Sequence, residues 1–188
     1  MKLKEIIKST AILLGREDVI SFIENGYAEN VEITKKDLLS FVWSANFVIN
    51  ELTTYLPIER WERRVVIEGK IPFDTLNHRI FKIKEILDLD GNKVDYKAFS
   101  DYVKIKNGTY DFFYYCVPTN VSLEDEIIYT ETEVPERIFV YGIAREMCMI
   151  EGRFDEAERW QKKFEKGVLD SIKPNRLKNV VIKERAFY

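Results

Sequence analysis

The sequence contains few of the residues from which many catalytic and metal sites are built, with only one histidine and two cysteines. Catalysis of the Ser-His-Asp or Cys-His kind needs a histidine, and His78 lies in a polar stretch ahead of an expected strand. One histidine and the distant Cys116 and Cys148 cannot form a tetrahedral metal site. The eight glycines are dispersed and form no phosphate-binding loop. We therefore expect no catalytic residue, no metal and no cofactor, and predict that the protein is not an enzyme.

Four further classes of protein are disfavoured by what the sequence lacks. Two cysteines are too few for a disulfide framework, which favours buried free thiols and a reducing, cytoplasmic setting. No apolar run reaches the about 18 residues of a membrane span. Lys4, Glu5 and Lys8 interrupt the N-terminal apolar stretch, so we expect no secretory signal either. A formal net charge of -3 argues against binding nucleic acid through general positive charge.

Three stretches that resemble binding sites are better interpreted as structure. Residues 88–92 space oxygen ligands like a calcium loop, but Phe99 stands where the loop needs its last glutamate, so a hairpin turn is favoured. The acidic residues of 124–126 and 131–133 form a charge run with no partner suited to acid–base catalysis, which indicates a solvated loop. The aromatic residues of 110–115 lack the flanking basic-glycine pattern of an RNA-binding sheet, so we expect them in the core.

The residues that are present predict a globular protein of α+β class. Hydrophobic residues make up 46% of the chain and charged residues 32%, which is enough to bury a core and stay soluble. Helical periodicity at both ends predicts a helical body built from residues 1–57 and 134–171. Residues 58–133 change to a period of two and are expected to form an inserted antiparallel sheet. Residues 172–188 are expected to be an extended basic tail.

Residues 1–57 are expected to form two small helices and one long helix. The first ends at Gly15 and the second before Gly26. Thr34 is expected to cap the third helix, over residues 38–52, and Pro57 prevents it from continuing. Its core face is expected to comprise Leu38, Val42, Ala45, Ile49 and Leu52, flanked by Leu39, Trp43 and Val48.

Residues 135–171 predict a helical hairpin that turns at Gly152. Pro135 and Glu136 suit the first turn of a helix. Apolar residues then recur at three- and four-residue steps. They are Phe139, Ile143, Met147 and Ile150 in the first helix, and Ala157, Trp160, Phe164 and Val168 in the second. We expect Trp43, Met147, Trp160 and Phe164 to share one core.

The expected strand over residues 110–117 is apolar on both faces. Alternate residues of a strand point to opposite sides, so Phe113, Tyr115 and Val117 share the face opposite Phe112. Two explanations stay open. The second face contacts a neighbouring subunit, or the strand is the central one of a small sandwich.

The basic tail is the second candidate for partner docking. It contains the short β-prone segment Val180, Val181 and Ile182 among basic residues. We expect this segment to add a strand to an exposed sheet edge, and Lys178, Lys183 and Arg185 to face an acidic rim on a partner. A frayed chain end is the alternative.

The helical hairpin carries a motif, E-R-x-x-x-Y-G-x-x-x-E-x-x-x-x-x-G-x-x-x-x-A-x-x-W. Its defined positions are Glu136, Arg137, Tyr141, Gly142, Glu146, Gly152, Ala157 and Trp160. With the order of the expected elements, this motif resembles the head-tail connector (adaptor) proteins of tailed bacteriophages and prophages. The segment Gly152-x-Phe154-x-x-Ala157 also resembles one tetratricopeptide turn, but such units need about three stacked copies.

The connector resemblance implies a structural virion protein, assembled in the bacterial host cytoplasm. Such a protein forms a homo-oligomeric ring, expected to hold about twelve copies. The ring docks on the portal protein, contacts the tail or a second connector, and lets DNA pass through its channel without specific binding. The alternative is a host helical scaffold or protein-binding module with a tetratricopeptide-like hairpin.

Overall fold

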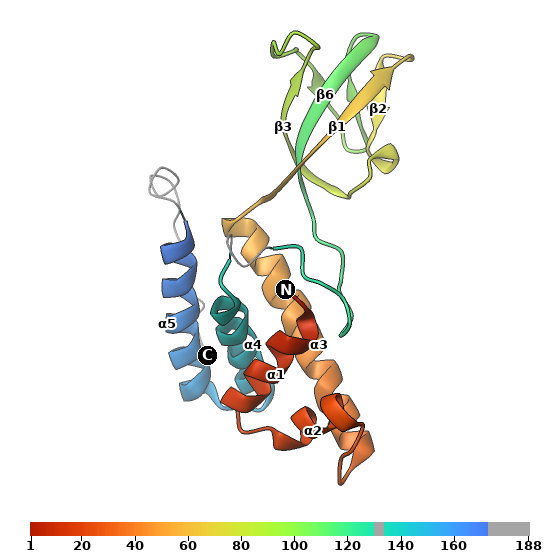
Figure 1. Ribbon diagram of the computed structural model, residues 1–188. Coiled ribbons are helices and arrows are strands. Elements are labelled where there is room, and N and C mark those ends of the chain that lie inside the picture. The colour runs from red at the N-terminus through yellow and green to blue at the C-terminus, as the bar shows by residue number, and fades with distance from the viewer. Residues whose placement is uncertain (130–133, 173–188) are drawn as a thin grey trace. The chain divides into compact units, whose positions relative to one another are not determined.

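The computed structural model describes residues 1–129 and 134–172 of the chain (Figure 1). Helices lie at both ends of the sequence and strands lie between them, which confirms the predicted α+β class. The elements in chain order are α1 (Leu3–Leu13), α2 (Glu17–Asn25), α3 (Val31–Tyr55), β1 (Ile58–Val66), β2 (Lys70–Pro72), the 3-10 turn η1 (Phe73–Thr75), β3 (Ile80–Leu87), β4 (Lys97–Ala98), β5 (Tyr102–Lys104), β6 (Gly108–Cys116), α4 (Glu136–Ile150) and α5 (Phe154–Ser171).

The chain divides into two compact units. The helical unit comprises residues 1–55 and the described residues from 119 onward, and the β unit comprises Leu56–Pro118. The predicted sheet region extended to residue 133, but residues 119–129 belong to the helical unit. The side chain of Asn46 in α3 accepts a bond from the N–H of Val121 and donates one to its carbonyl, at 2.8 and 2.9 Å. The N–H of Ile127 donates to the Met1 carbonyl, and Ile127 is buried.

Helix α4 is central to the helical unit because it contacts α1, α3 and α5. Helices α4 and α5 form the predicted hairpin, and the left-handed φ of 74° at Gly152 makes the turn between them possible. Gly142 is needed for close packing. A Cβ atom at this position would lie 2.7 Å from a Val48 methyl of α3 and 3.1 Å from the Phe164 ring of α5.

The ends of α3 differ in part from the prediction. The helix begins before Thr34, which is buried inside it, and the side chain of Asn30 accepts a hydrogen bond from the N–H of Ile33 in the first turn. Asn30 therefore supplies the capping oxygen that was expected from Thr34. The helix stops at Tyr55, ahead of Pro57, as predicted.

The expected position of Trp43 in the core is wrong. Trp43 is 70% exposed, and Trp160 is only half-buried, whereas Met147 and Phe164 are buried. Helix α3 has apolar residues on two opposite sides, and only one side can face α4. The side that does so carries the small residues Ser44 and Ala45, which let the two helices approach closely. The bulkier stripe of Leu39, Trp43 and Phe47 lies on the other side.

The β unit contains two three-stranded antiparallel sheets, in the orders β1-β6-β3 and β2-β5-β4. Strand β6 is the central strand of its sheet, consistent with one of the two explanations for its apolar pattern. Its side chains Phe112, Tyr114 and Cys116 are buried, and those of Phe113 and Tyr115 are half-buried. Both faces of β6 are therefore at least partly covered, and the face that carries Phe113 and Tyr115 is still accessible to solvent.

Candidate functional site

The accessible face of sheet β1-β6-β3, called the outer sheet face below, carries the predicted interface residues. Phe113 of β6 lies directly opposite Trp61 of β1, and their rings stack with centroids 6.2 Å apart. Trp61 is 59% exposed, and Val65, which lies four residues further along β1 on the same face, is 70% exposed. Tyr115 lies on the same face, between Glu59 and Lys82. This arrangement leaves a contiguous aromatic surface open to solvent.

Val117 is the third predicted interface residue, and it lies one position beyond the end of β6. Its N–H donates a hydrogen bond of 2.8 Å to the Arg79 carbonyl, ahead of β3, and its side chain is half-buried. Its backbone therefore continues the pairing of β6 with the neighbouring chain segment. The assignment of Phe113, Tyr115 and Val117 to a subunit interface stays a prediction.

Ion pairs lie on both sides of the aromatic surface. Arg63 donates two hydrogen bonds of 2.8 and 2.9 Å to Asp111, its cross-strand partner, and these bonds lower the pKa of the Asp111 carboxyl. Lys84 binds both carboxylate oxygens of Glu59 at 2.8 Å, which raises the pKa of Lys84. The Arg63–Asp111 and Lys84–Glu59 pairs are thus already formed, so a partner that covers them leaves no unpaired charge at these four positions.

The opposite face of the same sheet is held by a polar network. The Tyr114 hydroxyl donates to Glu62, which also accepts from the backbone and side chain of Asn77 and pairs with Arg64. Burial, followed by the bond to Glu62, raises the pKa of Tyr114, so this hydroxyl keeps its proton. The network fixes β1 against β6 and so holds Trp61 and Phe113 in register.

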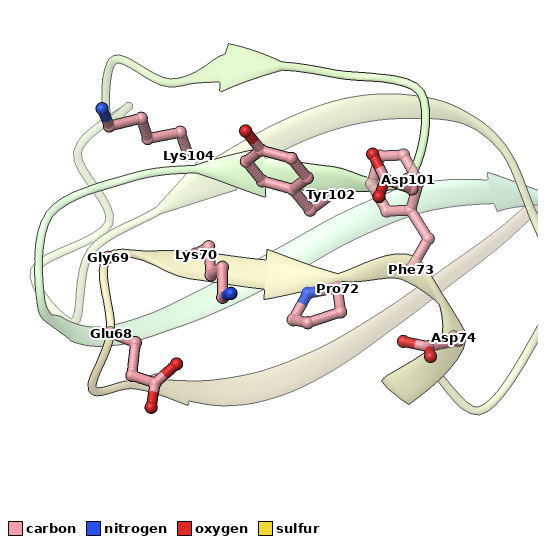
Figure 2. A pocket seen from close by; sticks show the side chains of 9 residues that line it. All are labelled: Glu68, Gly69, Lys70, Pro72, Phe73, Asp74, Asp101, Tyr102 and Lys104. Carbon is pink, nitrogen blue, oxygen red and sulfur yellow. The ribbon is translucent and has the colours of Figure 1, made fainter.

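A second surface lies on sheet β2-β5-β4, where two open hollows flank strand β5. One has a volume of about 610 Å³ and includes Lys70, Tyr102 and Lys104 in its lining (Figure 2). The other, of about 620 Å³, includes Lys97 and Lys106. Both hollows share Glu68, Gly69 and Lys104. No role could be predicted for these residues from the sequence, because the register that brings them together depends on pairing between strands.

The helical unit also has an exposed apolar stripe on α3, which includes Leu39 and Trp43, two residues that were predicted to lie beside or in the core. Leu39, Trp43 and Phe47 follow one another at four-residue steps along α3 and are 54%, 70% and 45% exposed. A different cluster joins the two helices of the hairpin. There the Lys163 ammonium lies 4.1 Å from the centre of the Trp160 ring, which itself stacks on the ring of Tyr141.

The residues considered for catalysis or metal binding lie apart from one another. His78 is exposed in the turn before β3. Within residues 1–129 and 134–172, no group of three or more His, Cys, Asp or Glu side chains is placed to hold a metal. Asp88 instead accepts hydrogen bonds from the N–H groups of Asp90 and Asn92, which closes a turn after β3 and lowers the pKa of Asp88. Cys116 and Cys148 are buried and free, and burial raises the pKa of Cys148 to about 11.

The predicted docking residues of the tail, Lys178, Val180, Val181, Ile182, Lys183 and Arg185, lie outside the described residues. The helices that are described include none that is both long and apolar enough to cross a membrane. In comparisons with known proteins, no protein-family model matches the chain, and no curated protein matches it.

Proposed function

We propose that the protein is a structural subunit of a ring that connects the head and the tail of a tailed bacteriophage or prophage particle. The ring docks on the portal protein, continues the DNA channel towards the tail or a second connector, and lets DNA pass without reading its sequence. Its place is the virion, after assembly in the bacterial host cytoplasm. The proposal includes no enzymatic step, cofactor or metal.

The observation that carries the proposal is the outer sheet face. A ring is closed by heterologous contacts, in which one surface of each copy meets a different surface of the next. Surfaces of this kind have aromatic anchors at their centre and polar groups around them. The stacked pair of Trp61 and Phe113, with Arg63–Asp111 and Lys84–Glu59 beside it, has this composition. The resemblance of the hairpin motif to connector proteins supplies the second support.

The proposal is tested by imaging the purified full chain by negative stain, alone and mixed with a portal protein, and by measuring its mass in solution. We expect rings in at least one of the two samples. Trp61→Glu should abolish the rings and leave a folded protein, because the Trp61 side chain is 59% exposed. Leu89→Glu is the matched control, since Leu89 is 63% exposed in the turn after β3, and this variant should still form rings.

Two results would contradict the proposal. One is a wild-type protein that stays monomeric in both samples, which would favour the alternative of a helical protein-binding module. The other is a Trp61→Glu variant that assembles as well as the wild type, which would mean that the outer sheet face does not join subunits.

A further inference from the structure

Three lysines stand in register across sheet β2-β5-β4. Lys104 of the central strand β5 pairs with Lys70 of β2 on one side and with Lys97 of β4 on the other. Directly opposite residues of antiparallel strands have Cβ atoms about 5 Å apart. The three side chains, called the lysine row below, therefore leave the sheet within about 10 Å of one another, on the same face. All three are exposed.

The lysine row is not neutralised by the carboxylates around it. Glu68, Asp74, Asp95 and Asp101 line the same hollows, yet none of the described carboxylates forms an ion pair with Lys70, Lys97 or Lys104. Lys97 has one contact of another kind, with the Phe99 ring at 5.3 Å. The neighbouring sheet differs, because its Arg63 and Lys84 are both paired with carboxylates.

Protection of sheet edges does not account for the row. Lysines on edge strands discourage pairing with other chains, and this explains Lys70 and Lys97. Lys104 lies on the central strand, where no edge needs protection. Like charges directly opposite one another destabilise a sheet. The row therefore destabilises the free protein, and an anion bound across it would remove that repulsion.

An aromatic pair lies next to the row on the same face. Tyr102 is two residues from Lys104, so both side chains point to one side of β5. Its ring stacks on that of Phe99, with centroids 4.6 Å apart and planes 12° from parallel. Figure 2 shows Tyr102 beside Lys70 and Lys104 at the first hollow. The surface thus offers evenly spaced positive charges alongside flat apolar rings.

We propose that the lysine row binds the phosphate backbone of a nucleic-acid strand, weakly and without reading its sequence. A nucleic acid presents repeated negative charge and flat rings side by side. An acidic protein surface presents the negative charge without the flat rings. The carboxylates of the hollows, Glu68 among them, repel the backbone and keep the affinity low. Binding this weak would still let DNA slide through the proposed ring. The binding itself does not require the ring, so it is tested independently of ring formation.

The test is fluorescence anisotropy with the full chain and a labelled short DNA of mixed sequence, as a duplex and as a single strand. Three phosphate contacts predict a slope of log K against log salt of about -2.7 for the duplex and about -2.1 for the single strand. The duplex affinity should then fall about 40-fold between about 50 and 200 mM salt. Lys104→Ala should reduce the duplex slope to about -1.8.

Variants of matched charge separate the row from general electrostatics. The triple variant Lys70→Ala, Lys97→Ala, Lys104→Ala should lose the binding. The control Lys35→Ala, Lys36→Ala, Lys166→Ala removes the same charge from exposed lysines elsewhere and should bind as the wild type does. Glu68→Gln should bind DNA more tightly. Any of three results would overturn the proposal. The two triple variants lose DNA affinity equally, the first triple variant binds DNA as the wild type does, or the protein binds polyglutamate more tightly than DNA. A first triple that still forms rings leaves the connector proposal intact.

Discussion

Arg145 is the only charged residue among the described part of the chain that is fully buried, and replacing it should severely destabilise the helical unit. Its guanidinium lies in α4 and donates to Gln161 of α5 at 2.6 Å, to Glu146 at 2.8 Å and to both oxygens of Glu51 in α3. It also lies 4.9 Å from the centre of the Phe164 ring. One side chain therefore joins three helices through charge-assisted bonds.

The magnitude follows from what Arg145→Met would leave behind. Methionine can fill most of the space, but the carboxylates of Glu51 and Glu146, whose side chains are only 16% exposed, lose their shared partner. Removing one member of a buried ion pair costs about 3–5 kcal/mol. Arg145→Lys should cost less, because it keeps the charge and loses the planar fork that reaches several acceptors. Adding Glu51→Gln to Arg145→Met should recover part of the loss.

The assay is urea unfolding followed by circular dichroism and tryptophan fluorescence, with the slope of free energy against urea checked for constancy. Arg137→Met is the matched control, since Arg137 is an exposed residue of the same helix, and it should change the free energy of unfolding by less than about 0.5 kcal/mol. A loss below about 1 kcal/mol for Arg145→Met, with an unchanged slope, would refute the reasoning that the buried network holds the three helices together.

Three more predictions follow from single contacts. Trp43→Ala should change the free energy of unfolding by less than about 0.5 kcal/mol in the same assay, because the side chain is 70% exposed; a loss above about 3 kcal/mol would return Trp43 to the core. Gly142→Ala should cost about 1–3 kcal/mol because its Cβ would meet a Val48 methyl at 2.7 Å, and Val48→Ala in the same chain should recover part of it. Arg63→Ala should raise the pKa of Asp111 towards 3.8, as measured by carboxyl NMR, and an unchanged pKa would contradict the pairing. Because the pairing lowers the pKa of Asp111 in the folded protein, its contribution to stability is present above pH 3.8 and is lost as the pH falls.

Features that depend on local physics could be predicted from the order of the residues alone. The turn at Gly152 and the apolar steps of Phe139, Ile143 and Met147 predict the hairpin of α4 and α5, because helix periodicity and a left-handed turn are properties of neighbouring residues. The change to a period of two located the strands in the same way. These patterns were sufficient for the α+β class and for the two faces of β6.

Where the sequence contains several equivalent patterns, only the tertiary structure decides which residues become buried or lie together. Helix α3 has two apolar stripes, and the choice between them depends on how closely α4 can approach the side with Ser44 and Ala45. The burial of Arg145 could not be predicted from α4 alone, because its acceptors come from three helices. The lysine row depends on strand register, which places Lys104 opposite Lys70, a residue about thirty positions away, and this pairing leaves no trace in the local sequence. Long-range packing, which a local pattern does not contain, is the common physical reason.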